Sequence, residues 1–134
     1  MTHYPPTSTA AGCLLVLAHG AGAGQRHPFM VAVARGLADR GIHVATFDFP
    51  YIREKRKVPD RAPVLEAAFR DAIGEARTAA GGDRRLFIGG KSMGGRMATH
   101  LAAQGVEGLG GVVALGYPLH PPGKPEQLRV AHLP

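Results

Sequence analysis

The sequence predicts an α/β fold, built as a parallel sheet with helices on both faces. The first observation is that its apolar runs are continuous rather than alternating, as in strands that are buried on both faces. The second is that segments with helical periodicity separate these runs along the chain. The third is size, because 134 residues with 45% hydrophobic residues are enough for one domain with its own core.

The first half of the chain is expected to supply two strands and one helix. Residues 1–11 are polar and contain prolines, which predicts a loose N-terminal lead-in. Cys13–Ala18 is a continuous apolar run typical of a buried strand, and a glycine-rich turn follows over residues 19–24. Apolar residues at helical spacing predict a helix over 29–40, and residues 42–49 predict the next strand.

The second half repeats this alternation. A basic loop that contains prolines is expected over 51–63, and the apolar spacing over 64–80 predicts a helix that ends at two glycines. A strand over 85–90 leads through a tight turn into a helix over roughly 95–104. The fourth strand is expected over 112–115, before a loop rich in proline.

The most informative motif follows the third strand, where Gly90-Lys91-Ser92-Met93-Gly94 has the spacing G-x-S-x-G. A strand, a tight turn and a helix in this order form a nucleophile elbow, in which a strained turn exposes the serine hydroxyl. The flanking glycines leave room for the strand and the helix to approach each other. Ser92 is therefore the candidate nucleophile, although the same spacing can arise by chance in a chain with 19 glycines.

Two nucleotide-binding motifs fail on spacing. A phosphate loop that ends in Gly90-Lys91-Ser92 would need a glycine at the position of Arg85, and a strand occupies the residues between. A dinucleotide fingerprint in the first glycine-rich turn would place its last glycine at Gln25 or His27. Neither pattern is complete, so no nucleotide cofactor is expected.

The first glycine-rich turn fits an oxyanion hole better. An acyl-transfer enzyme needs a backbone N–H group after this strand, together with the N–H of the residue that follows the nucleophile. These donors are expected to be Ala21 and Met93, with Gly22 as the second choice for the turn. Because backbone groups bind the oxyanion, small residues are expected at the turn.

Other polar residues at this edge have simpler explanations. The carboxyl ends of parallel strands meet at one edge of the sheet, where Asp48, Ser92 and Tyr117 fall. His19 is expected to bond loop backbone and Asp48 to organise a loop as an acceptor. Lys91 precedes the serine in an extended segment, so its side chain should point to the opposite side and form no Ser–Lys pair.

Composition excludes several classes of protein. The single cysteine, Cys13, rules out an internal disulfide framework and a cysteine-based metal site, and no metal or other cofactor is expected. The formal charge of +6 is densest over residues 53–57, but no nucleic-acid motif or stacking aromatics accompany it, so nucleic-acid binding is disfavoured. No membrane-spanning or export segment is visible, so a cytoplasmic location is the default expectation.

Four blocks in this order resemble the α/β-hydrolase superfamily, and more narrowly its short KANL/TEX-type members, which are related to dienelactone hydrolase. The resemblance covers nearly all of residues 13–134. It implies a serine hydrolase fold with Ser92 as the nucleophile. The blocks are Leu17-Ala18-His19-Gly20-Ala21-Gly22, Phe47-Asp48-Phe49-Pro50-Tyr51, the run from Gly89 to Arg96, and the run from Gly116 to Pro125.

The chain departs from the family pattern after the elbow. The resemblance implies an acid and a histidine that each follow a later strand, and no carboxylate or histidine after Ser92 is placed in this way. We therefore expect a partial α/β-hydrolase domain over 12–134, with about four strands present and the last two missing through C-terminal truncation. His120 is the best internal substitute for the base. Without a base the serine is a poor nucleophile, so little esterase activity is expected.

Two hypotheses of function follow. In the first, the chain is a serine hydrolase, or part of one, whose Ser92 attacks a small ester, thioester or amide, with Gly22, Tyr117 and His120 at the edge of the site. In the second, it is a non-catalytic, hydrolase-like binding or scaffold domain with a protein partner. Neither hypothesis identifies the substrate, because loops supply the pocket walls in this fold.

Overall fold

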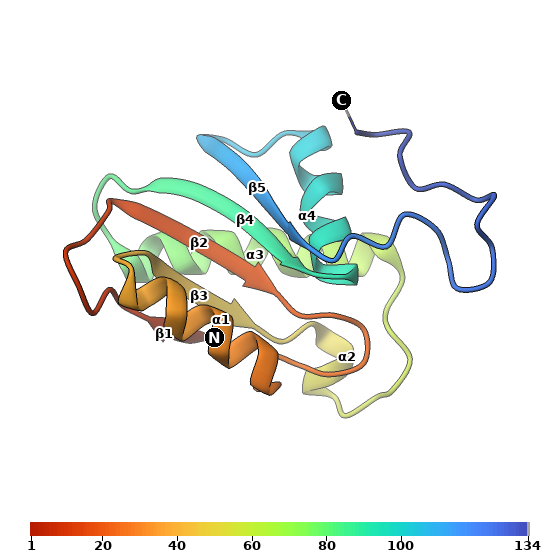
Figure 1. Cartoon of the computed structure of the whole chain (residues 1–134), viewed down its shortest axis with the longest axis horizontal. Coiled ribbons are helices and arrows are strands. Elements are labelled where there is room, and N and C mark those ends of the chain that lie inside the picture. The colour runs from red at the N-terminus through yellow and green to blue at the C-terminus, as the bar shows by residue number, and fades with distance from the viewer. Residues whose placement is uncertain (134) are drawn as a thin grey trace.

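One sheet of five strands organises the chain in the computed structural model, which describes residues 1–133 (Figure 1). The strands span Thr2–Tyr4 (β1), Cys13–Ala18 (β2), His43–Phe47 (β3), Arg85–Lys91 (β4) and Leu109–Leu115 (β5). Their order across the sheet is β1-β3-β2-β4-β5. Strands β2 to β5 are parallel to their neighbours, and β1 runs antiparallel to β3.

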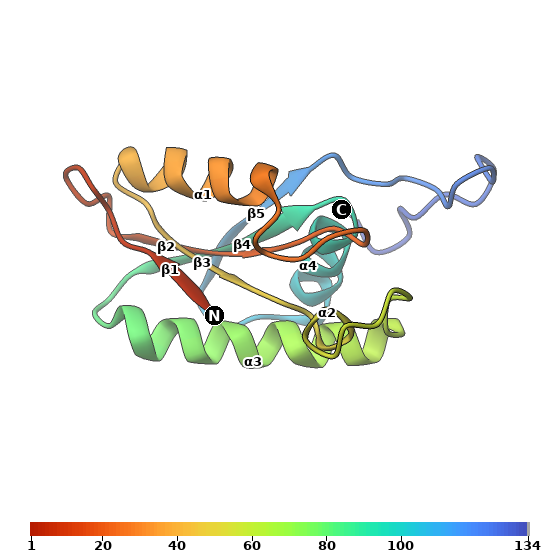
Figure 2. The same cartoon turned by 90° about the horizontal axis from the view of Figure 1, so that it is seen from below.

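Helices cover both faces of this sheet, as the sequence predicts. Helix α1 (Pro28–Asp39) lies on one face, and α3 (Ala62–Ala80) and α4 (Met93–Gln104) lie on the other (Figure 2). The short helix α2 (Pro50–Arg53) follows the end of β3. The α/β class and the mainly parallel sheet are therefore confirmed.

The first residues correct one expectation. Residues 1–11 are not loose throughout, because Thr2–Tyr4 form β1 at one edge of the sheet and pair with β3. The ring atoms His3 Nδ1 and His43 Nε2 lie 3.0 Å apart and join the two strands further. Three residues are too few to show a strand pattern in a sequence. The sheet therefore has one strand more than expected.

The predicted loop over 51–63 also contains regular structure, since α2 begins within the Phe-Pro-Tyr segment. The side chains of Phe49 and Tyr51 on either side of Pro50 are fully buried. The backbone N–H of Tyr51 donates to Asp60 Oδ2 at 2.9 Å, which closes the loop behind the helix. Burial of two aromatic rings here outweighs a composition that is typical of an open loop.

The last strand, β5, begins at Leu109 and not at residue 112 as predicted. Gly110 and Gly111 concealed its start, because glycine is uncommon in strands. Both lie beside the ring of Phe87, where a Cβ would come within 3.2 Å of a ring carbon. β5 pairs only with β4 in the described sheet, carries no charged residue and leaves Val113 37% exposed.

Two groups of buried side chains hold the layers together. The larger group lies between the sheet and helices α3 and α4, where the rings of Phe47, Phe49 and Phe69 contact one another at centroid distances of 5.0 to 6.2 Å. The smaller group lies under α1 and comprises Leu15, Leu17, Met30, Ala34 and Val44. Burial of these apolar surfaces on both sides fixes the sheet between its helices.

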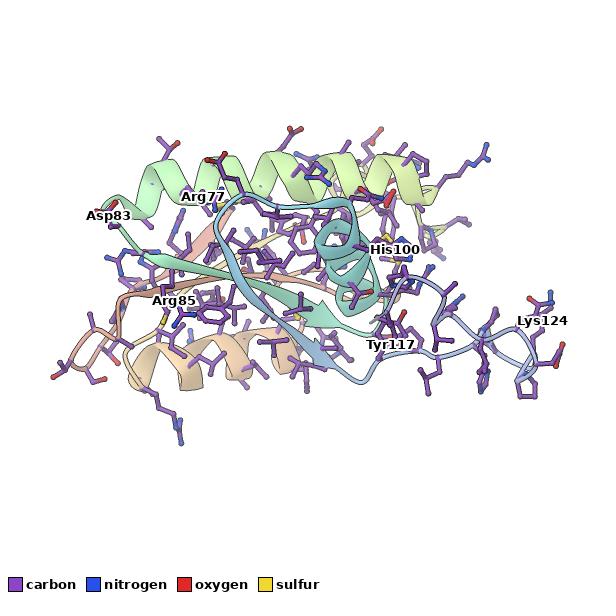
Figure 3. The ribbon with its side chains drawn as sticks, turned by 90° about the horizontal axis from the view of Figure 1, so that it is seen from above. Arg77, Asp83, Arg85, His100, Tyr117 and Lys124 are labelled. Atoms are coloured by element: carbon purple, nitrogen blue, oxygen red, sulfur yellow. The ribbon has the colours of Figure 1, made fainter. Side chains whose placement is uncertain are left out.

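After β5 the chain leaves the sheet and continues past α4 (Figure 3). Figure 3 shows Tyr117 where this segment starts and Lys124 at its far end. The Tyr117 hydroxyl donates to the backbone oxygen of Arg129 at 2.7 Å, which closes the segment into a loop. His132 Nε2 lies 2.7 Å from Thr99 Oγ1 and so attaches the segment to α4.

The end of β2 and the start of α4 approach each other through residues that have no side chain. A Cβ on Gly94 would lie 2.5 Å from the oxygen of Ala18 and 2.6 Å from that of His19. A Cβ on Gly90 would lie 2.5 Å from the same Ala18 oxygen. Since real Cβ atoms do not approach backbone oxygens this closely, only glycine fits at these positions.

We predict that Gly94→Ala lowers the free energy of unfolding by about 2 to 3 kcal/mol, because the new methyl group must push β2 and α4 apart. Urea unfolding followed by circular dichroism measures this change. Gly74→Ala is the matched control, since a Cβ at this exposed position in α3 meets nothing within 4 Å. The control should gain about 0.5 to 1 kcal/mol through helix propensity. Equal stability of the two variants would contradict the proposed close approach.

Candidate active site

The candidate nucleophile, Ser92, occupies the turn between β4 and α4. Its backbone angles are φ 51° and ψ −113°, in a region that residues with a Cβ rarely adopt. Its backbone is fixed on both sides, because the N–H donates to Leu115 O at 2.9 Å and the oxygen accepts from Arg96 N–H at 3.0 Å. The hydroxyl makes no side-chain cap to α4. The strained turn thus presents a hydroxyl that the helix does not use.

A cleft of about 400 Å³ lies beside this serine. A Cβ built on Gly20 would lie 3.7 Å from Ser92 Cβ, so the glycine-rich turn after β2 is adjacent to the elbow. The sequence-predicted residues Ala21, Gly22 and Ser92 are therefore brought together. The cleft is lined by Gly20, Ala21, Gly22, Ala23, His27, Met30, Lys91 and Ser92.

The glycine-rich turn is held from behind by hydrogen bonds to its carbonyl groups. The Tyr51 hydroxyl donates to Ala21 O at 2.8 Å, and a ring nitrogen of His19 lies 2.6 Å from Gly20 O. In a trans peptide the C=O and N–H groups point in opposite directions. The N–H groups of Ala21 and Gly22 therefore point away from the buried Tyr51 and His19 rings.

His19 is committed to this structural role. Its Nε2 accepts the backbone N–H of Phe49 at 2.9 Å, so in the neutral ring the proton is on Nδ1, which donates to Gly20 O. Burial lowers the pKa of His19, although the bond to Gly20 O and the charge of Asp48 act in the opposite direction. Both ring nitrogens are occupied, and the expectation that His19 bonds loop backbone is confirmed.

Asp48 organises the loop, as the sequence predicts. Its Oδ1 accepts the backbone N–H of Gln25 at 2.8 Å, and its Oδ2 lies 3.3 Å from Gln25 Nε2. The Gln25 side chain in turn accepts from the buried Thr46 hydroxyl at 2.8 Å. This chain of bonds connects the glycine-rich turn to β3. No motif surrounds Gln25, so this role could not be predicted from the sequence.

The remaining predicted site residues divide into two groups. Met93 is the first residue of α4, directly after Ser92, where helix N–H groups have no partner within the helix. Tyr117 and His120 are not among the residues that line the cleft. Tyr117 bonds Arg129 O, and the exposed His120 ring lies 2.9 Å from Pro121 O. The structure therefore does not bring the expected substitute base to the serine.

Two titratable residues that line the cleft, His27 and Lys91, had no place in the predicted site. His27 caps α1, because its Nδ1 accepts the backbone N–H of Phe29 at 3.1 Å. The Nζ of Lys91 lies 5.0 Å from the centroid of the Phe29 ring. Within residues 1–133, no hydrogen bond joins the Lys91 side chain to Ser92. The sequence predicts that the side chains of Lys91 and Ser92 point to opposite sides, but both residues line the same cleft.

The other histidines of the second half lie around α4. The rings of His100 and His132 meet edge to face at 4.5 Å, and His100 Nδ1 lies 3.5 Å from Glu66 Oε1 on α3 (Figure 3). Burial, with the neighbouring His132 and Arg96, lowers the pKa of His100. None of these side chains lines the cleft beside Ser92. They connect α3, α4 and the C-terminal segment.

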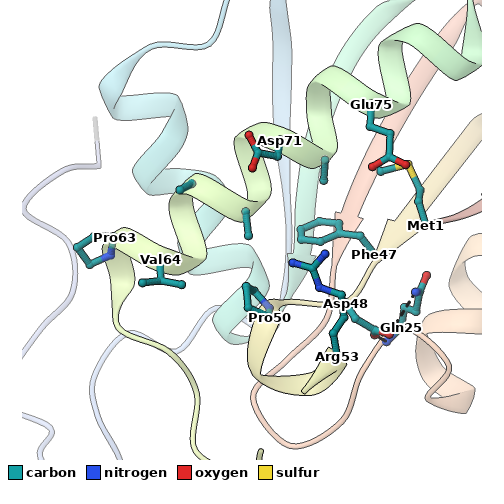
Figure 4. A pocket seen from close by; sticks show the side chains of 13 residues that line it. Met1, Gln25, Phe47, Asp48, Pro50, Arg53, Pro63, Val64, Asp71 and Glu75 are labelled. Atoms are coloured by element: carbon teal, nitrogen blue, oxygen red, sulfur yellow. Dashed lines mark hydrogen bonds between the residues drawn. The ribbon is translucent and has the colours of Figure 1, made fainter. Parts of the chain in front are cut away.

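A larger cavity of about 630 Å³ lies elsewhere, between β3, α2 and α3 (Figure 4). Its wall includes Asp48, Arg53, Asp71 and Glu75, and Figure 4 shows the hydrogen bond between Asp48 and Gln25 on one side. It contains neither Ser92 nor the turn around Ala21. We place the candidate site at the smaller cleft, because it joins the strained Ser92 to the turn whose N–H groups point away from the buried rings.

Within residues 1–133 no three histidine, cysteine, aspartate or glutamate side chains are grouped so that they could hold a metal ion. The same residues include no helix that is both long and apolar enough to cross a bilayer.

Comparison with known proteins decides the family. A family model described as an alpha/beta hydrolase domain matches residues 11–134, nearly the whole chain. The chain belongs to the alpha/beta hydrolase family. The resemblance noted in the sequence is thereby confirmed, and the strand order and helix layers agree with it.

Three solved structures show the same fold. A lidless α/β serine hydrolase from Xanthomonas campestris has a TM-score of 0.70 and 20% identity over 87% of this chain and 55% of its own. A thermostable carboxyl esterase from Bacillus coagulans has a TM-score of 0.67 and 18% identity, over 84% of this chain and 37% of its own. A dienelactone hydrolase from Anabaena variabilis has a TM-score of 0.64 and 20% identity, over 84% of this chain and 54% of its own. The chain thus spans about a third to a half of the length of these hydrolases.

The elbow angles lead to a prediction about stability. Ser92→Gly should be more stable to urea than Ser92→Ala by about 1 kcal/mol, because glycine adopts a positive φ without strain whereas alanine does not. Both variants lose the hydroxyl, so the comparison isolates the backbone. If alanine were the more stable of the two, the elbow would not be strained as described.

Burial of His19 leads to a second prediction. Its pKa in the folded chain lies below 6.5, so the unfolded chain binds the proton more tightly. Stability is therefore full above pH 6.5 and is lost as the pH falls from there toward the folded pKa. The pKa values of His43 and His100 are lowered as well, chiefly by burial, and add to the same loss.

Urea unfolding at several pH values between about 8 and 5 tests this assignment. His19→Gln should cost about 1 to 3 kcal/mol at pH 8, because the Phe49 N–H and the Gly20 oxygen lose a shared partner. Its stability should then fall less steeply with acid than that of the wild type. His120→Gln, at an exposed ring, should reproduce the wild-type slope. A parallel slope in the His19 variant would show that His19 is not the buried neutral group.

Proposed function

We propose that this chain carries the nucleophile and oxyanion hole of a serine hydrolase that acts on a small ester, thioester or amide. The observation that carries the proposal is the strained, uncapped Ser92 next to a turn whose carbonyl groups are bound from behind. Membership of the alpha/beta hydrolase family supports the same function. This chain spans only about a third to a half of its solved relatives. The catalytic activity of a complete hydrolase therefore belongs to the proposal.

In the proposed mechanism, Ser92 Oγ attacks the carbonyl carbon of the substrate. The carbonyl oxygen gains negative charge and accepts hydrogen bonds from the N–H groups of Ala21 and Met93, with Gly22 as an additional donor. The tetrahedral intermediate collapses when the alcohol, thiol or amine leaves with a proton. Water then attacks the acyl-enzyme, and release of the acid restores the Ser92 hydroxyl.

Proton transfer limits this mechanism. The serine must lose its proton to a base as it attacks, and each described histidine outside the cleft is bonded elsewhere or lies around the C-terminal segment. His27 lines the cleft, but its Nδ1 caps α1 and no hydrogen bond joins it to Ser92 among residues 1–133. We therefore expect slow turnover by this chain alone, with the oxyanion hole as its main source of rate enhancement.

That no base is hydrogen-bonded to Ser92 among residues 1–133 favours a second candidate function. A hydrolase-like domain whose serine has no paired base can serve as a binding or scaffold domain for a protein partner. This candidate and the hydrolase differ in one respect, namely whether the Ser92 hydroxyl reacts with an acyl-like electrophile.

We predict that a fluorophosphonate probe labels the wild-type chain at Ser92. Ser92→Ala should reduce labelling at least about tenfold, because the oxyanion donors proposed beside Ser92 favour reaction of this hydroxyl with the probe. Gel fluorescence and peptide mass spectrometry measure the extent and the site. The chain offers a matched control in Ser8, its other serine, which lies exposed in the N-terminal segment. Ser8→Ala should label like the wild type, and equal labelling of all three proteins would sink the hydrolase proposal.

A further inference from the structure

The residue before the candidate nucleophile contributes a positive charge to the cleft. Lys91 is the single lysine or arginine among the described residues that line it, and no aspartate or glutamate lines it with Lys91. The stem of Lys91 runs beside the oxyanion turn, since a Cβ on Gly20 would lie 3.9 Å from Lys91 Cδ. Ser92, the turn and a cationic side chain therefore share one space of about 400 Å³.

This charge has no acidic partner within the described part of the chain. The salt bridges there join Arg56 to Glu54 and Asp60, and His100 to Glu66, and none involves Lys91. Asp48, a carboxylate of the neighbouring loop, is occupied by two bonds to Gln25 and faces the other cavity.

The Phe29 ring holds the Lys91 side chain in place. The Nζ atom lies 5.0 Å from the ring centroid, in the geometry of a cation–π contact. A lysine ammonium group donates several hydrogen bonds and can therefore bind an anion while it contacts the ring. Lys91 is partly exposed and lines the cleft, and Phe29 is 38% exposed, so the contact lies where a ligand in the cleft can reach it.

We infer that Lys91 binds a carboxylate carried by the substrate, so that the cleft selects anionic esters, thioesters or amides over neutral ones. The inference rests on the proposed function, which makes the ligand of this cleft an acyl substrate. The apolar side of the cleft, formed by Met30 and Ala23, suits the short carbon chain that would connect the carboxylate to the reacting carbonyl. Lys91 would act as a specificity residue and not in the chemical step.

A binding experiment tests this without requiring turnover. In the Ser92→Ala chain, esters are bound but not cleaved by the serine, and NMR titration gives their dissociation constants. The probes are 4-nitrophenyl hydrogen glutarate, with a carboxylate on the acid part, 4-carboxyphenyl butyrate, with a carboxylate on the alcohol part, and neutral 4-nitrophenyl butyrate. At least one anionic ester should bind about 5- to 10-fold more tightly than the neutral one, and higher salt should weaken that preference.

Variants of Lys91 assign the effect to this side chain. In the Ser92→Ala background, Lys91→Gln should abolish the preference for the anionic ester, whereas Lys91→Arg should retain most of it. Lys57→Gln is the matched control, because it removes the same charge from an exposed position in the loop after α2. Melting curves of all variants check that each is folded.

The outcomes separate the two proposals. Undetectable binding of both anionic esters, equal affinity for anionic and neutral esters, or an unchanged preference in Lys91→Gln would each overturn the role of Lys91. Labelling of Ser92 by the fluorophosphonate probe together with any of these results would leave the hydrolase proposal intact. Binding of an anionic ester through Lys91 without labelling of Ser92 would overturn the hydrolase and retain the anion site.

Discussion

The close contact between the end of β2 and the start of α4 determines most of what this chain can do. Backbone oxygens of Ala18 and His19 occupy the space that a side chain on Gly94 would need. This contact brings the turn after one strand next to the turn after another, although more than sixty residues separate them in the sequence. It also places Ser92 at the beginning of a helix, where unpaired N–H groups are concentrated.

A second layer of side chains behind the cleft sets the direction in which the backbone N–H groups of the glycine-rich turn point. His19 and Tyr51 bind the carbonyl groups of the glycine-rich turn, and Phe49 connects His19 to the segment after β3. These side chains never reach the cleft, yet they fix which way its peptide groups face. Burial lowers the pKa of His19 and thereby maintains its neutral, bridging form. Burial raises the pKa of the Tyr51 hydroxyl to about 12, so it stays a donor at ordinary pH.

The parts of this structure that the sequence predicts are those encoded by neighbouring residues. The tight turn at Ser92, the buried strand before it and the amphipathic helices each depend on local spacing, and the structure contains them near the expected positions. β1 could not be predicted, because three residues are too few to show the alternation of a strand and because its pairing partner β3 is distant in the sequence. The positions of His27 and Lys91 in the wall of the cleft could not be predicted for a related reason. They follow from how α1 and β4 meet in space, which no spacing along the chain reports.

The antiparallel strand at the edge of the sheet also bears on the order in which the molecule can assemble. The partners of residues 2–4 are residues 44–46, about forty positions later in the chain. During translation β1 therefore cannot form this pairing until β2, α1 and β3 have been synthesised. Since β4 and β5 are synthesised after β3, β1 can complete its side of the sheet before the opposite side is made.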